Sequence, residues 1–205
     1  MAQFHHGISA AEVNSGIIPI RTAATAVIGL IAVASDADAS VFPLDTPVLV
    51  TSISRALISA GYDGTLRRAL EAMQPITNPT MVVIRVANTD PTTVIGSGSG
   101  QRTGVHALLT AQSVLGITPK ILVAPELETP DVDQALIAVA KKLRAMVYAT
   151  PRDAQQVMLT TKEAVATYRD TLAAREIILI WPEFTSGNVL LDPTPEPDPV
   201  DPVGL

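Results

Sequence analysis

The sequence has 205 residues, no cysteine, and 14 lysine and arginine residues against 20 aspartate and glutamate residues, for a formal net charge of −6. The absence of cysteine excludes a disulfide scaffold, a cysteine-based metal site and a cysteine nucleophile. A hydrophobic content of 47% excludes a wholly disordered chain. The acidic balance and an aromatic content of only 3% disfavour nucleic-acid binding.

The most apolar stretch, residues 23–34, is too short to span a membrane. It has about 12 residues, whereas a spanning helix needs about 20. Arg21 lies two residues before this stretch, and no cleavage pattern follows the stretch, which argues against a signal peptide. We therefore expect a soluble protein that is cytoplasmic at synthesis, with no membrane insertion.

The N-terminal part of the chain predicts an extended arm followed by an α/β subdomain. Residues 1–22 show no helical period, and their apolar alternation suits short strands or an extended arm. Within residues 23–90, apolar runs predict strands at 26–34, 48–50 and 81–86. Thr65 is expected to cap a helix whose apolar side chains share one face: Leu66, Ala69, Leu70 and Met73.

Residues 91–104 are rich in glycine and serine and predict a loop at a subdomain boundary. Helices and strands then alternate through a second subdomain, residues 105–185. The expected helices are 105–112, 130–144 and 161–172, and the expected strands are 121–124, 146–150 and 176–181. This alternation predicts an α/β fold class (α+β overall), with β/α units around a largely parallel sheet.

The ends of these helices carry recognisable signals. Thr129 is expected to cap a helix beginning at Pro130, with Asp131 and Asp133 in its first turn. Lys141, Lys142 and Arg144 lie at its negative end, and Thr160 with Glu163 has the spacing of a capping box. The run 177–180 is apolar on both faces, as in a strand covered on both sides.

Residues 186–205 form a proline-rich acidic tail, expected to be extended and flexible.

The Gly-Ser-Gly-Ser-Gly run at 96–100 invites a phosphate-loop interpretation, because backbone amides at a helix start can cradle an anion. Its spacing matches neither a dinucleotide fingerprint nor a Walker loop, and Gly98 stands where a nucleophile elbow needs serine. A solvated loop is the favoured interpretation. An anion- or nucleotide-binding α/β domain using residues 96–104 remains the alternative.

No other set of residues forms a catalytic or metal-binding constellation. His5 and His6 would point to opposite faces of a strand, and His106 has no evident acid/base partner. The remaining candidates have simpler explanations: Asp36 with Asp38, and Asp131 with Asp133, in turns and helix starts; Arg67–Arg68 on a solvated helix face; and Trp181–Phe184 packed at the end of the sheet. We therefore expect no enzyme, no cofactor and no metal.

Ordered blocks across residues 4–185 resemble the contractile-tail sheath proteins of temperate myophages and R-type bacteriocins. The blocks that carry the resemblance are Phe4-His5-His6-Gly7, Ser35-Asp36-Ala37-Asp38, Phe42-Pro43-Leu44, Pro47–Thr51, Gly64-Thr65-Leu66, Gly104–Leu115, Pro119–Leu122, Lys141–Ala145 and Arg175–Phe184.

The resemblance implies a structural subunit without enzymatic activity. It would polymerise as stacked hexameric rings around a tail tube and contract to drive the tube through the host envelope. Its partners would be copies of itself, the tail tube protein, and the baseplate and tail-terminator proteins. It would reside in the virion tail, and in the host cytoplasm during assembly.

The resemblance also implies that residues 1–22 are an inter-subunit arm that donates a strand to a neighbouring sheet. The residues of that arm expected to make the contact are Phe4, Ile8, Val13, Ile17, Ile18 and Ile20. Sheath chains of this type are roughly twice as long. The sequence therefore corresponds to the N-terminal half of the family's chains.

Overall fold

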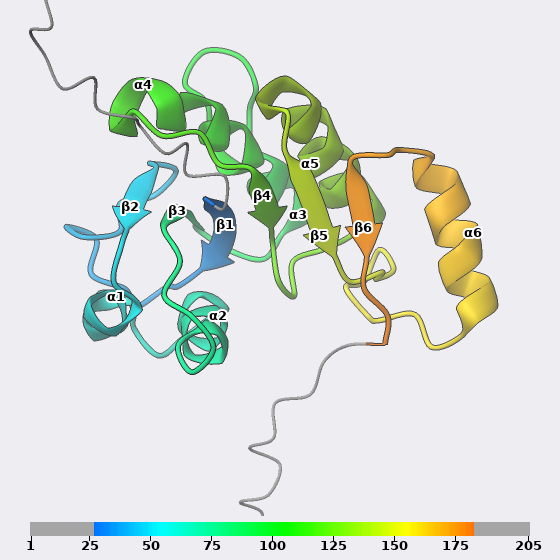
Figure 1. The fold of residues 1–205 in the computed structure, drawn as a ribbon, viewed down its shortest axis with the longest axis horizontal. Coiled ribbons are helices and arrows are strands. Elements are labelled where there is room, and N and C mark those ends of the chain that lie inside the picture. The colour runs from blue at the N-terminus through cyan, green and yellow to red at the C-terminus, as the bar shows by residue number, and fades with distance from the viewer. Residues whose placement is uncertain (1–26, 183–205) are drawn as a thin grey trace, which may run out of the picture.

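The computed structural model describes residues 27–182, which form a six-stranded sheet with helices on its faces (Figure 1). The predicted arm (1–22) and tail (186–205) lie outside the described residues. The strands are β1 (Ile28–Val33), β2 (Val48–Val50), β3 (Met81–Val86), β4 (Ile121–Val123), β5 (Met146–Ala149) and β6 (Ile177–Leu179). The helices are α1 (Ile53–Ser59), α2 (Leu66–Met73), α3 (Pro91–Ile95), the 3₁₀ helix η1 (Gly104–Thr110), α4 (Ala111–Leu115), α5 (Pro130–Leu143) and α6 (Lys162–Leu172).

The strand order is β2-β3-β1-β4-β5-β6, and only β2 runs antiparallel to its neighbour. This confirms the predicted α/β class with a largely parallel sheet. β1 is central: Gly29 is in register with Val82 of β3 on one side and with Leu122 of β4 on the other. The strands expected in residues 23–90 and in residues 105–185 therefore belong to one sheet.

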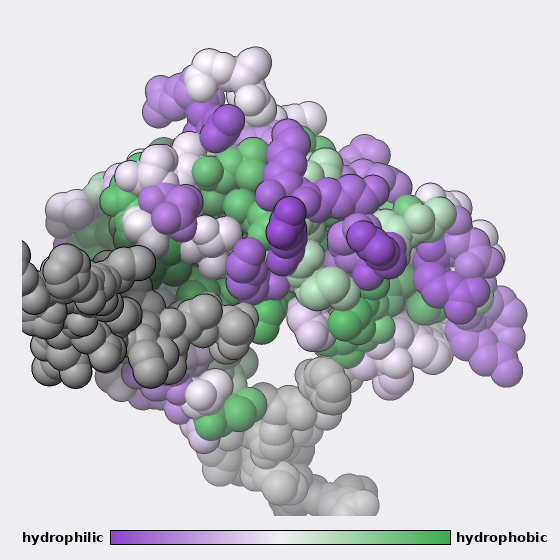
Figure 2. All heavy atoms as spheres, turned by 45° about the horizontal axis from the view of Figure 1, so that its top comes forward, coloured by the Kyte–Doolittle hydropathy of each residue, from purple (hydrophilic) through white to green (hydrophobic). Residues whose placement is uncertain are grey.

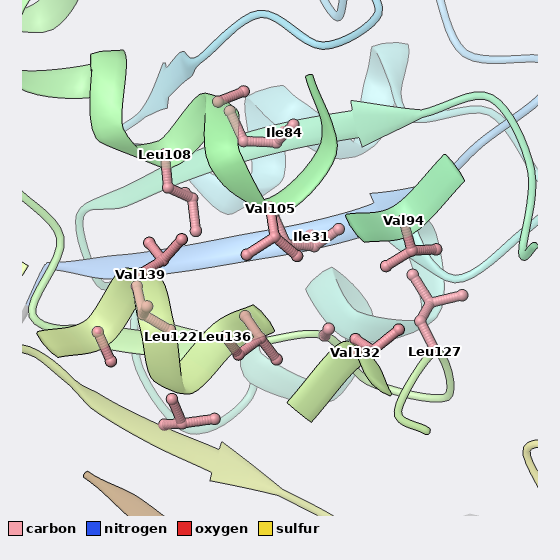
Figure 3. Packing of buried hydrophobic residues seen from close by; sticks show 14 of the residues in the cluster. Ile31, Ile84, Val94, Val105, Leu108, Leu122, Leu127, Val132, Leu136 and Val139 are labelled. Atoms are coloured by element: carbon pink, nitrogen blue, oxygen red, sulfur yellow. The ribbon is translucent and has the colours of Figure 1, made fainter. Parts of the chain in front are cut away.

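The two faces of the sheet bury different side chains of β1. Ile31 and Val33 face α3, η1, α4 and α5, where Leu108 and Leu136 complete the larger core (Figure 3). The alternate residues of β1, Leu30 and Ala32, face a second core built with α1 and α2. Each core is almost entirely aliphatic, as the low aromatic content predicts.

The predicted helix start is confirmed at α5, is off by one residue at α6, and is right in position at α2 but without the expected side-chain cap. The Thr129 hydroxyl accepts a hydrogen bond from the Val132 amide, and α5 begins at Pro130 as expected. The cap of α6 is Thr161, whose hydroxyl accepts from the Ala164 amide, so the expectation at Thr160 was wrong by one residue. Thr65 occupies the N-cap position of α2 as expected, but its hydroxyl does not bond to the helix amides and instead accepts a hydrogen bond from the Val33 amide in β1.

Two segments differ in secondary structure from the expectation. The helix expected at 105–112 is the 3₁₀ helix η1 followed by the short helix α4. η1 passes close to β1, where a Cβ on Gly29 would lie 3.1 Å from the Leu108 side chain. The glycine-rich segment 91–104 contains α3, capped by the Asp90 carboxylate on the Thr92 amide.

β6 is not covered on both faces as expected. It is the edge strand of the sheet, and the Ile178 side chain is 40% exposed. Ile177 and Leu179 pack beside α6 with Tyr168 and Leu172. The apolar character of the run therefore reflects one covered face and one face open to solvent.

Within residues 27–182, none of the helices has the length and apolar character that a membrane-spanning helix needs.

Candidate interaction surfaces

A pair of buried carboxylates, Glu128 and Asp133, lies beside the C-terminal ends of β4 and β5. Asp133 is completely buried in the first turn of α5, and Glu128 is 3% exposed in the preceding loop. The Tyr168 hydroxyl on α6 donates a 2.7 Å hydrogen bond to Asp133 Oδ2. Arg152 Nε lies 3.4 Å from Glu128 Oε2. The cluster therefore joins α5, α6 and the loops that follow β4 and β5.

Burial controls the protonation of this cluster. Loss of solvation raises the pKa of Glu128 to about 7 and that of Asp133 to about 7, and the charge of Glu128 adds to the effect on Asp133. Burial and the neighbouring Asp133 also raise the pKa of Tyr168, so its hydroxyl remains a hydrogen-bond donor. Asp133 cannot meet a substrate because it is sealed from solvent. The arrangement is suited to holding elements together.

Sequence reasoning placed Asp133 in the first turn of a helix but missed its burial. A signal was present, because Asp133 shares a helical face with Ile137 and Ala140, both of which are buried. Asp131, on the same turn, is exposed as a helix-start residue should be. Glu128 carried no such signal, since its burial depends on how the loop folds against β5.

Of the two acidic residues after β1, Asp38 serves a local turn as predicted, whereas the Asp36 carboxylate joins its turn to the loop after α1. The Asp36 carboxylate accepts hydrogen bonds of 2.7 and 2.9 Å from the backbone amides of Tyr62 and Asp63. Asp38 accepts from the amide and hydroxyl of Ser40. These hydrogen bonds lower the pKa of both carboxyl groups, so both remain charged at neutral pH.

Arg67 and Arg68 point to different partners and do not form an anion clamp. Arg67 pairs with Glu71 at 2.7 Å on α2 and lies 4.1 Å from the centre of the Tyr62 ring. Arg68 pairs with Glu126 at 2.7 Å in the loop after β4. The prediction of a solvated helix face is confirmed for Arg68, whereas Arg67 is half-buried.

The loop 96–104 closes on itself and leaves few amides for an anion. The Ser97 amide donates to the Thr103 hydroxyl, and the Gly104 amide donates to the Asp45 carboxylate at 2.7 Å. An anion at this helix start would face the negative charge of Asp45. This geometry argues against the phosphate-site alternative.

The remaining residues considered from the sequence, His106 and Trp181, each make their own local contacts and do not form a common site. His106 is half-buried with Nδ1 enclosed, and burial together with the charges of Lys142 and Arg102 lowers its pKa. The Trp181 indole donates a 2.6 Å hydrogen bond to the Leu159 carbonyl, which supports packing at the sheet end. His5, His6 and the arm residues lie outside the described residues. Within residues 27–182, no group of three potential ligands could hold a metal ion.

Two apolar grooves lie on the surface, one along the edge strand β2 and one on the face of the sheet beside α2. One, of about 280 Å³, follows the edge strand β2 and is lined by Phe42, by β2 itself and by Ala56 of α1. The other, of about 270 Å³, lies between α2 and the exposed face of the β4–β6 half, where Met73, Val123, Tyr148 and Ile180 line it. Exposed strand edges and apolar grooves are features of surfaces that pack against other polypeptides.

Comparison with known proteins gives one consistent family. Residues 25–86 match the model "Tail sheath protein Gp18 domain III N-terminal region". The chain is 37% identical to the tail sheath protein of Escherichia phage P2, over 95% of this chain and 51% of the relative. It is 39% identical to the major tail sheath protein of Serratia phage KSP20, over 90% and 48%. A putative prophage major tail sheath protein of Pseudomonas aeruginosa (strain UCBPP-PA14) is 30% identical, over 87% and 47%.

The matches cover nearly all of this chain but only part of each relative, so the chain spans about half the length of the curated relatives it matches. These relatives are phage tail proteins of a structural, non-enzymatic family. Over nearly all of its length, the chain is therefore a homologue of the phage tail sheath proteins and corresponds to about half of their length.

Proposed function

We propose that this chain acts as a subunit of a contractile phage tail sheath. In this role it polymerises as stacked hexameric rings around a tail tube and contracts to drive the tube through the host envelope. The single observation that carries the proposal is the 37% identity to the phage P2 tail sheath protein over 95% of the chain. Its place is the virion tail, with assembly in the host cytoplasm.

The partners in this proposal are further copies of the chain, the tail tube protein, and the baseplate and tail-terminator proteins. The apolar residues of the arm, Phe4, Ile8, Val13, Ile17, Ile18 and Ile20, would contact a neighbouring subunit. Strand addition needs an unpaired edge, and the sheet offers one at β2 and another at β6. The partial coverage of the relatives means that the rest of a sheath protein would contribute further contacts.

Negative-stain electron microscopy of the concentrated, purified chain, with the molar mass measured on the same sample, tests the proposal. Rings or tubes are the expected result, and removal of residues 1–22 should abolish them. A matched control removes the acidic tail, residues 192–205, and should leave assembly intact. A chain that remains monomeric at all concentrations would contradict assembly by this polypeptide.

A further inference from the structure

The edge of the sheet formed by the N-terminal ends of the parallel strands is basic. α5 ends there with Lys141, Lys142 and Arg144, and Arg175 lies just before β6. A hollow of about 480 Å³ opens between these segments, lined by Lys141, Arg144, Arg175 and Glu176. Figure 2, which turns this edge toward the viewer, shows hydrophilic side chains gathered across the middle of the face.

The opposite edge, at the C-terminal ends of the same strands, is acidic. Acidic residues follow the strands or begin the next helix: Asp36 and Asp38 after β1, Asp90 after β3, Asp131 at the start of α5, and Asp153 and Glu163 between β5 and the first turn of α6. The chain therefore carries opposite charges on the two ends of its parallel strands.

This separation of charge arises from the charge preferences of individual helix ends, which the parallel fold aligns at the two edges of the sheet. Acidic side chains favour the positive N-terminal end of a helix, and basic ones favour the negative C-terminal end. α5 obeys this rule, with Asp131 and Asp133 in its first turn and Lys141 and Lys142 in its last. In parallel β/α units each crossover helix runs opposite to the strands. Helix starts therefore gather at one edge of the sheet and helix ends at the other.

Many of these charges are available for contact. Lys142 and Arg144 are exposed, and neither forms an ion pair within the described part of the chain. At the other edge, Asp38 and Asp90 accept hydrogen bonds from amides and hydroxyls of their own turns, and Asp36 accepts from amides of the loop after α1. These bonds lower the pKa of all three carboxyl groups and keep them ionised.

Two of the edge charges are paired within the fold, Arg175 with Glu176 and Glu163 with Lys162. Lys142 and Arg144 at one edge and Asp131 at the other form no ion pair within the described part of the chain, so each edge still presents charge to a partner.

We propose that the basic edge of one copy docks on the acidic edge of a second copy of this chain. Because the two complementary surfaces lie at opposite ends of one molecule, the contact is head-to-tail and can repeat without closing on a pair. Charge complementarity of this kind fixes orientation and speeds encounter more than it adds affinity. The inference rests on the self-association in the proposed function and specifies which surfaces meet.

A charge-swap experiment tests this contact. The basic-edge variant Lys142→Glu/Arg175→Glu should associate at least about tenfold more weakly than the wild type in sedimentation velocity at low salt. The acidic-edge variant Asp131→Lys/Glu163→Lys should show the same loss. An equimolar mixture should regain association, because each variant then offers the charge that the other lacks. Glu71→Lys, an exposed charge reversal on α2, is the control and should associate like the wild type.

The outcomes separate this contact from the proposed function. Raising the salt from about 50 mM to about 500 mM should weaken wild-type association, because surface charges are then screened. Association that persists in both variants overturns the edge pairing and leaves sheath assembly standing through other contacts. A wild-type chain that is monomeric at low salt, or a mixture that fails to regain association, also overturns the pairing. Charge-dependent oligomers without rings or tubes would support the pairing and count against the sheath role.

Discussion

The Tyr168 hydroxyl on α6 donates a 2.7 Å hydrogen bond to the fully buried Asp133 carboxylate on α5. It is the one hydrogen bond between side chains of these two helices within residues 27–182, and it lies beside the small apolar cluster of Ile137 and Leu172. Because α6 covers the edge strand β6, this contact helps to hold the outer third of the sheet together.

Replacing Tyr168 with Phe should lower the free energy of unfolding by about 1–3 kcal/mol, because Asp133 Oδ2 would lose its donor in a buried site. Urea denaturation at pH 7 measures the loss. Tyr62→Phe removes the same hydroxyl from a ring that is 82% exposed and should change stability by less than about 0.5 kcal/mol. Equal effects from both substitutions would show that the buried hydrogen bond contributes no more to the free energy of unfolding than an exposed hydroxyl does.

Stability should fall as the pH rises from about 5 to 7. In this window the folded chain holds protons on Glu128 and Asp133, whose pKa values are raised to about 7, whereas the unfolded chain has already released them. Folding therefore takes up protons, and this contribution to stability is lost as the pH rises. Above about pH 8 the curve should flatten, since both states are then ionised.

The variant Asp133→Asn should reduce this slope, and it should gain stability relative to the wild type as the pH rises, by up to about 1.4 kcal/mol per unit of pH. The amide oxygen can still accept the Tyr168 hydroxyl. Asp131→Asn, on an exposed side chain of the same helical turn, is the matched control and should keep the wild-type slope. Thermal unfolding at a series of pH values measures both, and an unchanged slope in Asp133→Asn would refute the assignment.

Gly64→Ala should destabilise the fold by more than about 2 kcal/mol. Gly64 has a φ of +101°, and a Cβ there would lie 2.2 Å from the Val33 carbonyl oxygen at the end of β1. Gly100→Ala is the control: its φ is +67°, but no atom lies within 4 Å of the added Cβ. It should cost only the left-handed backbone penalty of about 1 kcal/mol. Chemical denaturation compares the two, and a smaller loss at Gly64 would contradict the close packing.

Thr65→Val should cost about 1–3 kcal/mol, because the hydroxyl of Thr65 accepts a 3.1 Å hydrogen bond from the buried Val33 amide. Valine preserves the volume and removes only the acceptor. The control Thr171→Val removes an exposed hydroxyl that donates to a carbonyl within α6. Unfolding measurements should show a change below about 0.5 kcal/mol for the control. If both variants were equally stable, Thr65 would have no part in joining α2 to β1.

Sequence reasoning could predict the role of a site residue only where its contacts lie close to it along the chain. The turn role of Asp38 follows from Ser40 nearby, and sequence reasoning found it. The Asp36 carboxylate instead accepts hydrogen bonds from the Tyr62 and Asp63 amides, which no local pattern predicts. The acid pair depends on Tyr168, 35 residues beyond Asp133, and no local pattern links the two. The arm residues 1–22 remain a prediction, because they lie outside the described part of the chain.

The sequence by itself determined the elements: runs of apolar residues placed all six strands, and Thr129 with Pro130 placed the start of α5. It also determined the kinship with tail sheath proteins, through blocks spread along the chain. Only the tertiary structure decided the strand order, the exposed face of β6 and the opposite charges of the two sheet edges. The physical reason is that periodicity reports the local environment of a residue, whereas neighbours in a parallel sheet meet through crossovers of many residues.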